Sequence, residues 1–543
     1  MAKIFQEDIS ITFEEVQSVF AEYQMIGFTV LLSLLVVAVM STPTEAFSSK
    51  FVYISKARSD LLEDLEHPFR LHEKFPAQSD EEKTIDLSVE SDTIPDVTHF
   101  CFLIHGHRGL SRDLKYLQAV LERFGDFEQE RIQRRWIQSQ QDACDSDRLQ
   151  NSDRILPPRQ RLVVHNCLSN EGKTHDGVAA GGDRVVAEML DTIRSEMSDR
   201  PSLLGDSKEP LDITISILGN SLGGLFGRYA IAKLVERHGV CQESSSHSQE
   251  TCWILDEKYR LHLNVFCSTA SPHLGVANHT YFSVPRPAEV VVAHAMGDTG
   301  RDLFRLNDLV RTMATCPSYL GPLSSFRKRI AVANVHNTDF PVPTNTAAFL
   351  SVNSTYPHMP IAKSKEDCAN DESGKKSMIV ATFHTPSEDE LNSMINKEMK
   401  EDREEEQYVE RHVDELHEMS ESLDKLGWKK VFVDLRDELP SIKVPRIQIP
   451  FVSKENETVD FESLKNSGRS VSSMDISAVV GQKDNRVSVP LGHNMIVAFS
   501  RSPLSTYMNR GGRSIVDNLA QDLARDIFSW STLSDERSKI PNI

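Results

Sequence analysis

Residues Ile213–Ala230 read ITISILGNSLGGLFGRYA, and this stretch decides the fold. An apolar, β-branched run enters GNSLG at residues 219–223, and a helix-like pattern leaves it. The pattern G-x-S-x-G between a strand and a helix is typical of a nucleophile elbow, a sharp and strained turn that presents the serine hydroxyl at the top of a sheet. Gly219 and Gly223 leave room for that turn. We therefore expect a nucleophilic Ser221, with the helix N-terminus ready to stabilise a negative charge.

Apolar strands and amphipathic helices alternate along most of the chain. Each expected strand is a short apolar run, and segments with apolar residues at three- and four-residue spacing, typical of helices, lie between these runs. This alternation predicts βαβ units and a mostly parallel central sheet flanked by helices, an α/β fold. The expected strands cover residues 97–104, 161–165, 213–218, 261–267, 329–336 and 428–434, with helices near 114–121 and 183–197.

Composition narrows the class of protein. The chain has 543 residues, of which 39% are hydrophobic, enough for one large domain with insertions or for two domains. Its formal net charge is −20 and no block is rich in lysine and arginine, so nothing favours nucleic-acid binding. The eight cysteines contain no C-x-x-C pair, which argues against a zinc site or a disulfide framework. Most are expected as free thiols, and a Cys241–Cys252 pairing stays open.

Residues 25–41 form an apolar segment without a charged side chain. The segment is short for a membrane-spanning helix and long for the apolar part of a signal peptide, and the residues before it are net acidic. Three interpretations stay open: a membrane anchor, which we favour, a cleaved signal with Met25 as an alternative start, and a plastid-type targeting segment that ends before Phe47. We therefore expect an anchor or targeting segment at 1–47, followed by a polar connector at 48–94.

A serine becomes nucleophilic when an imidazole takes its proton and a carboxylate orients that imidazole. In α/β-hydrolases these partners follow the serine in the order acid, then histidine. Asp339 comes just after the expected strand 329–336, so we predict its carboxylate at the carboxyl edge of the sheet. His493 lies beyond the last expected strand. Asp339 and His493 are the predicted acid and base, and Asp434, at the end of the next strand, is the rival acid.

An oxyanion hole needs two backbone N–H donors. One is expected from Leu222, the residue after the nucleophile, and the other from His107, in the loop after the first strand. The H-x-H pair in this loop is a weak metal signal without an acidic or histidine partner, so no metal is predicted. The residues expected to support the elbow and this loop are Gly219, Asn220, Gly223, His105, Gly106 and Gly109.

These motifs, in this order, resemble the lipase-like serine esterases of the α/β-hydrolase superfamily (domain of unknown function 676). The elbow has Asn220 where that family usually has histidine, a position outside the triad. The resemblance covers about residues 95–535. The matching segments besides the elbow are HG-x-x-G at 105–109, THDGV at 174–178, GG-x-R at 181–184, GRYA at 227–230, SPHLG at 271–275, the turn around Asp339 and GHN at 492–494.

The resemblance implies an α/β-hydrolase domain at 95–535 that hydrolyses carboxylic esters, often of lipids, through an acyl-enzyme and without a cofactor. One insertion lies where such enzymes often carry a lid; its apolar residues suit an acyl chain and equally suit a cap that buries its own core. Another holds a long charged helix or helical hairpin at 388–426, which begins with a capping box at Ser387. The three expected insertions lie near 125–158, 276–328 and 358–426.

Two alternatives to ester hydrolysis stay open. Acyl transfer or thioester hydrolysis would use the same triad, whereas a non-catalytic, membrane-anchored scaffold would recruit partners through the charged helix. The expected partners of a hydrolase are a lipid or other hydrophobic ester and a membrane, reached through residues 25–41. The sequence does not name a protein partner, a head group or a chain length.

Overall fold

The computed structural model describes most of the chain from Val97 onward. The expected anchor at 25–41 and the connector lie outside the described residues, and none of the described helices is long and apolar enough to cross a bilayer. The chain divides into two compact units, Lys74–Ser500 with Asn509–Ile543, and Met1–Glu73 with Arg501–Met508. The described residues are 97–144, 160–198, 210–238, 252–277, 286–336, 338–340, 342–361, 378–398, 414–439, 441–443, 470–473, 476, 486–488 and 491–538.

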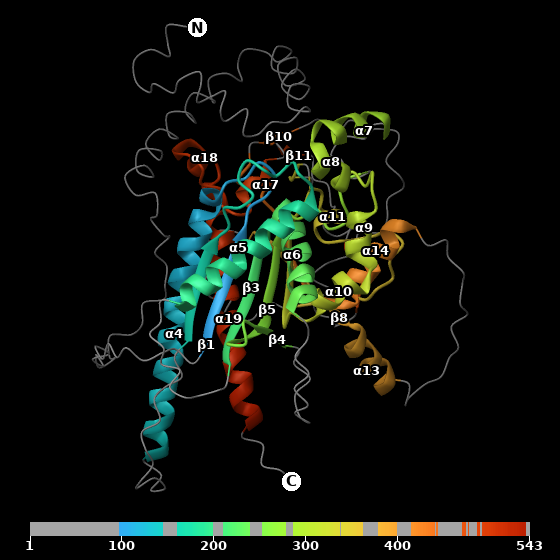
Figure 1. Cartoon of the computed structure of the whole chain (residues 1–543). Helices are drawn as coiled ribbons and strands as arrows, with labels where there is room; N and C mark the ends of the chain where they lie inside the picture. Colours follow the sequence, from blue (N-terminus) through green and yellow to red (C-terminus); the bar gives the residue numbers. More distant parts are fainter. Residues whose placement is uncertain are drawn as a thin grey trace, which may run out of the picture. The chain divides into compact units, whose positions relative to one another are not determined.

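A nine-stranded sheet forms the centre of the larger unit (Figure 1). Its order is β2-β1-β3-β5-β6-β9-β8-β7, and β4 pairs with β5. The first six strands in this order are mutually parallel, so their carboxyl ends share one edge. The strands are β1 (Val97–Ile104), β2 (Gln160–Asn166), β3 (Leu211–Asn220), β4 (Cys252–Leu255), β5 (Tyr259–Thr269), β6 (Lys328–Asn334), β7 (Met359–Pro360), β8 (Ile379–Ser387) and β9 (Leu426–Val433).

Every predicted strand is present in this sheet, and the predicted α/β fold is confirmed. The inner parallel strands are mostly buried on both faces, which explains why they read as continuous apolar runs rather than as alternating ones, whereas β2 at the edge of the sheet is partly exposed. All eight residues of β1 are buried, as are the last eight of β3. Outside the sheet, β10 (Ser441–Lys443) and β11 (Arg486–Ser488) form a separate antiparallel pair.

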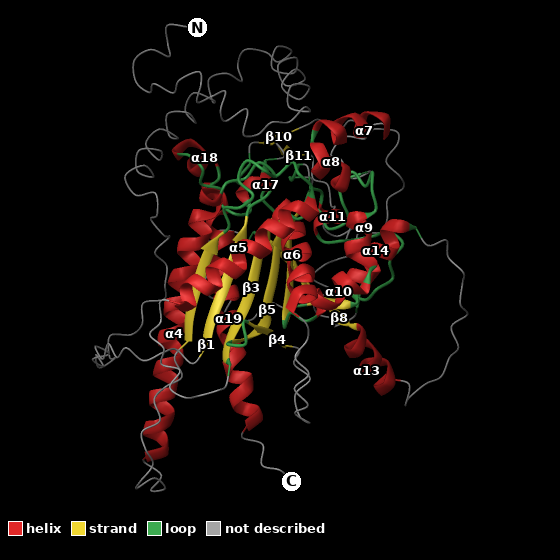
Figure 2. Cartoon of the chain, viewed as in Figure 1, coloured by secondary structure: helices red, strands yellow, loops and turns green. Residues whose placement is uncertain are grey.

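Two pairs of helices cover the two faces of the sheet (Figure 2). α4 packs against α19, which also contacts β1 and β5, while α5 packs against α6, which covers β3. Apolar side chains of α5 and α6, such as Met189 and Phe226, join Ile215 of β3 in the main core. The helices outside the cap are η2 (Ser111–Leu114), α4 (Lys115–Cys144), α5 (Val178–Ser198), α6 (Leu222–His238), α11 (Thr344–Ala347), α13 (Glu388–Glu398), α14 (Glu415–Asp424), α17 (Gly492–Met495), α18 (Pro503–Met508), η3 (Arg510–Gly512) and α19 (Arg513–Ser538).

The expected insertion at 125–158 stays a prediction, and its first part is helical. Residues 125–144 continue α4 without a break, and 145–158 lie outside the described residues. Residues 125–144 are rich in Glu, Gln and Arg, which are good helix formers, and contain no proline. Its polarity is that of a helix with one solvated face. Glu128 is buried there and accepts a hydrogen bond from Nε of Arg131 at 2.7 Å.

Part of the expected insertion at 358–426 belongs to the sheet, and the insertion itself stays a prediction. β8 runs antiparallel between β9 and β7 and extends the sheet beyond the parallel strands. The charged segment after it contains α13 and α14, separated by residues that the structure does not describe. The predicted capping box is confirmed: the Ser387 N–H donates to Oε2 of Glu390 at 2.7 Å, and the Glu390 N–H donates to Oγ of Ser387 at 3.3 Å.

Four helices build a cap over residues 286–324. Of its apolar residues, Leu303, Phe304 and Met313 are buried in the main core, whereas Val291 is 70% exposed. The cap therefore buries most of its own apolar surface, as one of the two interpretations expected. Its helices are α7 (Arg286–Ala295), α8 (Gly297–Leu303), α9 (Leu309–Thr315) and α10 (Pro317–Ser324).

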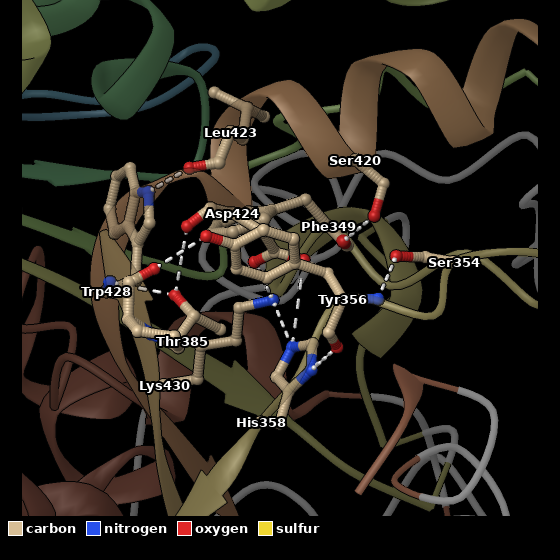
Figure 3. A network of polar contacts seen from close by, with 11 residues as sticks. Phe349, Ser354, Tyr356, His358, Thr385, Ser420, Leu423, Asp424, Trp428 and Lys430 are labelled. Atoms are coloured by element: carbon tan, nitrogen blue, oxygen red, sulfur yellow. Dashed lines mark hydrogen bonds and ion pairs between the residues drawn. The ribbon is translucent and has the colours of Figure 1, made fainter. Parts of the chain in front are cut away.

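A sealed polar network ties α14 to β9 (Figure 3). Lys430, Asp424 and His358 have no exposed surface. Nζ of Lys430 lies 2.6 Å from Oδ1 of Asp424, donates to Nε2 of His358 at 2.9 Å, and sits 4.0 Å from the centre of the Phe349 ring. Because Nε2 accepts, the proton of His358 is on Nδ1, which donates to the Tyr356 carbonyl at 2.9 Å. The network holds the segment after the predicted acid against the sheet.

Candidate active site

The chain turns sharply at Ser221, between the last residue of β3 and the first residue of α6. Ser221 has a φ of 55°, in the left-handed region that a serine rarely adopts, and it is 7% exposed. Its N–H donates to the Thr269 carbonyl at 2.8 Å, which pins the turn to the end of β5. Asn220 also connects the turn to β5, because its Oδ1 accepts a hydrogen bond from Oγ1 of Thr269 at 2.9 Å. The strain of the elbow is thus held by the neighbouring strand.

Close backbone packing explains the glycines around the elbow. A Cβ on Gly219 would overlap the backbone of Gly224, and a Cβ on Gly223 would overlap the carbonyl of Ile104 at the end of β1. Neither neighbour is a flexible side chain that could move aside. The predicted Gly219 and Gly223 are therefore needed for packing as well as for the turn.

Asp339 and His493, the predicted acid and base, lie together. Nδ1 of His493 donates to Oδ1 of Asp339 at 2.8 Å, although 154 positions separate them in the chain. An isolated bridge between Asp339 and Leu491 and a 2.8 Å bond from the Gly492 N–H to the Thr338 carbonyl bring α17 to this position. Asp339 is 2% exposed, whereas the His493 side chain keeps 16% of its surface exposed. The imidazole is held by the carboxylate and is partly exposed.

Asn334 is a residue of this site that the sequence analysis missed. It ends β6, and its Nδ2 donates to Oδ2 of Asp339 at 2.6 Å, while the Val342 N–H lies 3.4 Å from Oδ1. These two donors orient the carboxylate toward His493. No sequence pattern marks Asn334, because an asparagine at the end of a strand is also common in turns.

The rival acid Asp434 is engaged elsewhere. It follows β9, and its Oδ2 accepts a hydrogen bond from Nη2 of Arg436 at 2.7 Å, with Nε2 of His336 at 3.7 Å. Burial alone would raise the pKa of Asp434, but the Arg436 guanidinium holds it below its usual value. The carboxylate that contacts His493 belongs to Asp339.

The loop after β1 packs directly on Ser221. A Cβ on Gly106 would lie 2.6 Å from Cβ of Ser221 and 3.0 Å from its Oγ. The Gly109 N–H donates to the Gly106 carbonyl at 3.0 Å and closes a turn. The N–H of His107, inside this turn, takes no part in that hydrogen bond. Leu222 is the first residue of α6, so its N–H has no acceptor within the helix. Gly109 packs against Nδ1 of His105, at 2.7 Å from the position of an added Cβ.

The two histidines of this loop are neutral. Burial, and then the neighbouring His175 and Arg108, lower the pKa of His107 to about 4. Burial likewise lowers the pKa of His105, whose Nδ1 donates to the Gly106 carbonyl at 3.1 Å. Neither ring belongs to a metal-type cluster within the described residues. His107 and His105 therefore shape the loop without adding a positive charge beside Ser221.

The structure does not join all three predicted triad members. Asp339 and His493 are hydrogen-bonded, but within the described residues the Ser221 hydroxyl makes no hydrogen bond to the imidazole. Such bonds often form only when substrate binds, because the apo geometry of catalytic sites is looser. The serine, the histidine and the acid all lie at the carboxyl edge of the sheet, where the loops gather around α17 (Figure 2).

Comparison with known proteins agrees with this geometry. Residues 95–350 match a family model described as "Putative serine esterase (DUF676)". The matched range contains the loop after β1, the elbow, the cap and Asp339, and it ends before His493. No curated protein matches the chain.

Proposed function

Residues 95–350 belong to the putative serine esterase family, and from this premise we propose that the chain hydrolyses carboxylic esters of lipids through a Ser221–His493–Asp339 triad. The family supports a serine esterase activity. The triad, the lipid substrate and the role of each residue are our proposal.

The proposed reaction begins when Oγ of Ser221 attacks the ester carbonyl while Nε2 of His493 takes the hydroxyl proton. Asp339 keeps the imidazole in the tautomer with a proton on Nδ1 and stabilises the imidazolium that forms. The N–H groups of Leu222 and His107 stabilise the tetrahedral oxyanion. His493 then protonates the leaving alcohol, and water attacks the acyl-enzyme by the same route in reverse.

One observation carries the proposal: the 2.8 Å hydrogen bond from Nδ1 of His493 to a buried Asp339. It fixes which ring nitrogen is protonated and leaves Nε2 as the base. Ser221, at a φ of 55°, supplies the nucleophile that such a base needs. A scaffold without catalysis has no requirement for this pair.

The cap supports the proposal that the substrate carries a hydrophobic acyl group. Val290 to Val292 of α7 are exposed or half-buried, while the rest of the described apolar cap residues mostly fill its core. An apolar anchor at 25–41 would hold the enzyme at a membrane, where a lipid ester is found. The membrane association is proposed from the sequence alone.

The test uses the full chain and nitrophenyl esters of increasing acyl length. We expect hydrolysis that increases with chain length, is lost in Ser221→Ala and is kept in Ser216→Ala. Ser216 is a matched control, because it is a buried serine on the same strand, five residues before the nucleophile. A dominant transfer product when an alcohol competes with water would establish the acyltransferase alternative instead. A folded chain with no turnover of any ester would overturn the proposal and favour the scaffold.

A further inference from the structure

His165, Cys167 and Glu188 form a cluster of metal-type side chains away from Ser221. His165 lies near the end of β2, Cys167 is the first residue after it, and Glu188 comes from α5. One ligand atom from each side chain lies within 4.8 Å of the other two. Among the described residues this is the cluster of three such side chains that comes close enough to share an ion.

The donor set suits one metal best. A thiolate, an imidazole nitrogen and a carboxylate oxygen are the ligands of Zn²⁺, which prefers four of them in a tetrahedron. Metal–ligand distances of about 2.0 to 2.3 Å place tetrahedral ligands about 3.5 Å apart. Nε2 of His165 and Oε1 of Glu188 are now 2.9 Å apart, so the ring and the carboxylate would need to separate by less than about 1 Å.

The carboxylate is already held as metal-binding carboxylates usually are. The Leu168 N–H donates to Oε1 of Glu188 at 2.7 Å, and the Ser169 N–H donates to Oε2 at 2.9 Å. Such outer donors orient a ligand without occupying all its lone pairs. The backbone of Cys167 is fixed as well, because its N–H donates to the Leu103 carbonyl at 2.9 Å.

The thiol of Cys167 lies in the interior beside the Glu188 carboxylate, and the residue is 1% exposed. A metal ion binds the thiolate, so the thiol proton would be released to solvent as the ion binds.

A cavity lies beside one member of the cluster, His165. It measures about 340 Å³, its lining also includes Ser111 and the cationic Arg112 and Lys115, and neither Cys167 nor Glu188 lines it. The cavity leaves room beside His165 for a water molecule as a fourth ligand.

We propose that His165, Cys167 and Glu188 bind one Zn²⁺, with water as the fourth ligand. The ion would link the start of the loop at 167–177 to α5. This loop supports the segment after β1: the Arg108 N–H donates to Oγ1 of Thr174 at 2.8 Å, and the Ser111 N–H donates to Oε1 of Glu171 at 2.6 Å. The proposal does not depend on the esterase activity.

Cobalt, a coloured substitute for zinc, tests the site in the metal-free full chain. We expect about one Co²⁺ per chain with a thiolate-to-cobalt absorption band, which Zn²⁺ abolishes by competition. The band should be absent in Cys167→Ser and retained in Cys267→Ser, because Cys267 is an equally buried thiol on β5. Glu188→Gln should weaken Co²⁺ binding by about tenfold or more.

A stability readout is independent of the spectrum. Added Zn²⁺ should raise the Tm of the wild type and of Cys267→Ser, and should leave the Tm of Cys167→Ser unchanged. If Cys167→Ser does not fold, Glu188→Gln serves for the same comparison. A wild-type chain with no charge-transfer band, or with a band that both the Cys167 and the Glu188 variants keep, would overturn the proposal.

Discussion

Two buried carboxylate–imidazole arrangements in this chain use the same groups in opposite ways. Asp339 bonds to His493 at the edge of the sheet, and the imidazole is partly exposed. Asp424 and His358 both contact Lys430 of β9, and none of the three has exposed surface (Figure 3). In the first pair we propose that the carboxylate orients a base for the substrate. In the second, both groups surround one buried cation.

The two arrangements differ in access and in counter-charge rather than in residue type. Burial raises the pKa of Asp424 to about 6 despite the opposing Lys430, and burial lowers the pKa of His358 well below its usual range. Such groups are expensive to ionise alone and are stable only together. The Asp339 pair should therefore control turnover, and the Lys430 network should control folding.

Replacing the two histidines gives the largest expected contrast. His493→Gln removes the base, and kcat/KM should fall by about 10⁴- to 10⁶-fold, as for other triad histidines. Its Tm should change little, because the side chain is partly exposed. His358→Gln should lower the Tm and keep the activity of each folded molecule. Rates of ester hydrolysis and the Tm of both variants measure this contrast. Equal losses of activity in the two variants would contradict the assignment of His493 as the base.

The two candidate acids give the next contrast. Asp339→Asn should lower kcat by about 10³- to 10⁴-fold, since the amide no longer fixes the tautomer of His493. Asp434→Asn breaks the contact with Arg436 and should change kcat by less than about tenfold, because Asp339 and not Asp434 is hydrogen-bonded to His493. Steady-state kinetics on both variants decides between them, and the reverse order would make Asp434 the acid.

The buried lysine should affect stability alone. Lys430→Met leaves Asp424 without its cation and should lower the free energy of unfolding by about 3 to 5 kcal/mol. The double variant Lys430→Met with Asp424→Leu should recover most of that loss, because no buried charge remains. Urea unfolding measures the free energy of unfolding of the single and the double variant. A single variant as stable as the wild type would show that the pair does not act as a unit.

A pH dependence of stability gives the smallest effect. Burial lowers the pKa of His99 to about 4, while its hydrogen bonds to Gln160 and Thr214 keep the ring in place. The unfolded chain takes up this proton near pH 6.5 and the folded chain only near 4, so stability is lost as the pH falls through that window. The loss from His99 should reach about 3 kcal/mol.

His99→Gln tests this by unfolding at a series of pH values. Between pH 6.5 and 4 its stability should fall less steeply than that of the wild type, by about 1.4 kcal/mol per pH unit. Parallel curves for the two proteins would show that His99 does not titrate as its burial implies.

Local sequence patterns predicted the strands and the turn whose structure depends mainly on neighbouring residues. The strands of the parallel sheet read as apolar runs because both their faces are covered, and G-x-S-x-G needs only a strand before it and a helix after it. Asp339 and His493 could be placed by chain order, since Asp339 follows a strand whose position was already clear. That the imidazole contacts Asp339 and not Asp434 depends on a bridge at Leu491, which no local pattern encodes.

The features that the sequence did not indicate depend on partners far along the chain. β8 alternates buried and half-buried residues and joins the rest of the sheet through β9, and it falls within the predicted insertion at 358–426. Lys430 sits in an expected strand, and its burial requires Asp424 and His358 from other segments. His165 and Cys167 lack a third ligand until α5 brings Glu188 beside them.

The most direct test of the proposed nucleophile is labelling of the full chain with a fluorophosphonate, followed by mass spectrometry. The account predicts a single adduct on Ser221, formed more slowly in Asp339→Asn, at the wild-type rate in Asp434→Asn, and absent in Ser221→Ala. A folded chain that forms no adduct at Ser221, or that is labelled at another serine and still hydrolyses esters after Ser221→Ala, would contradict it.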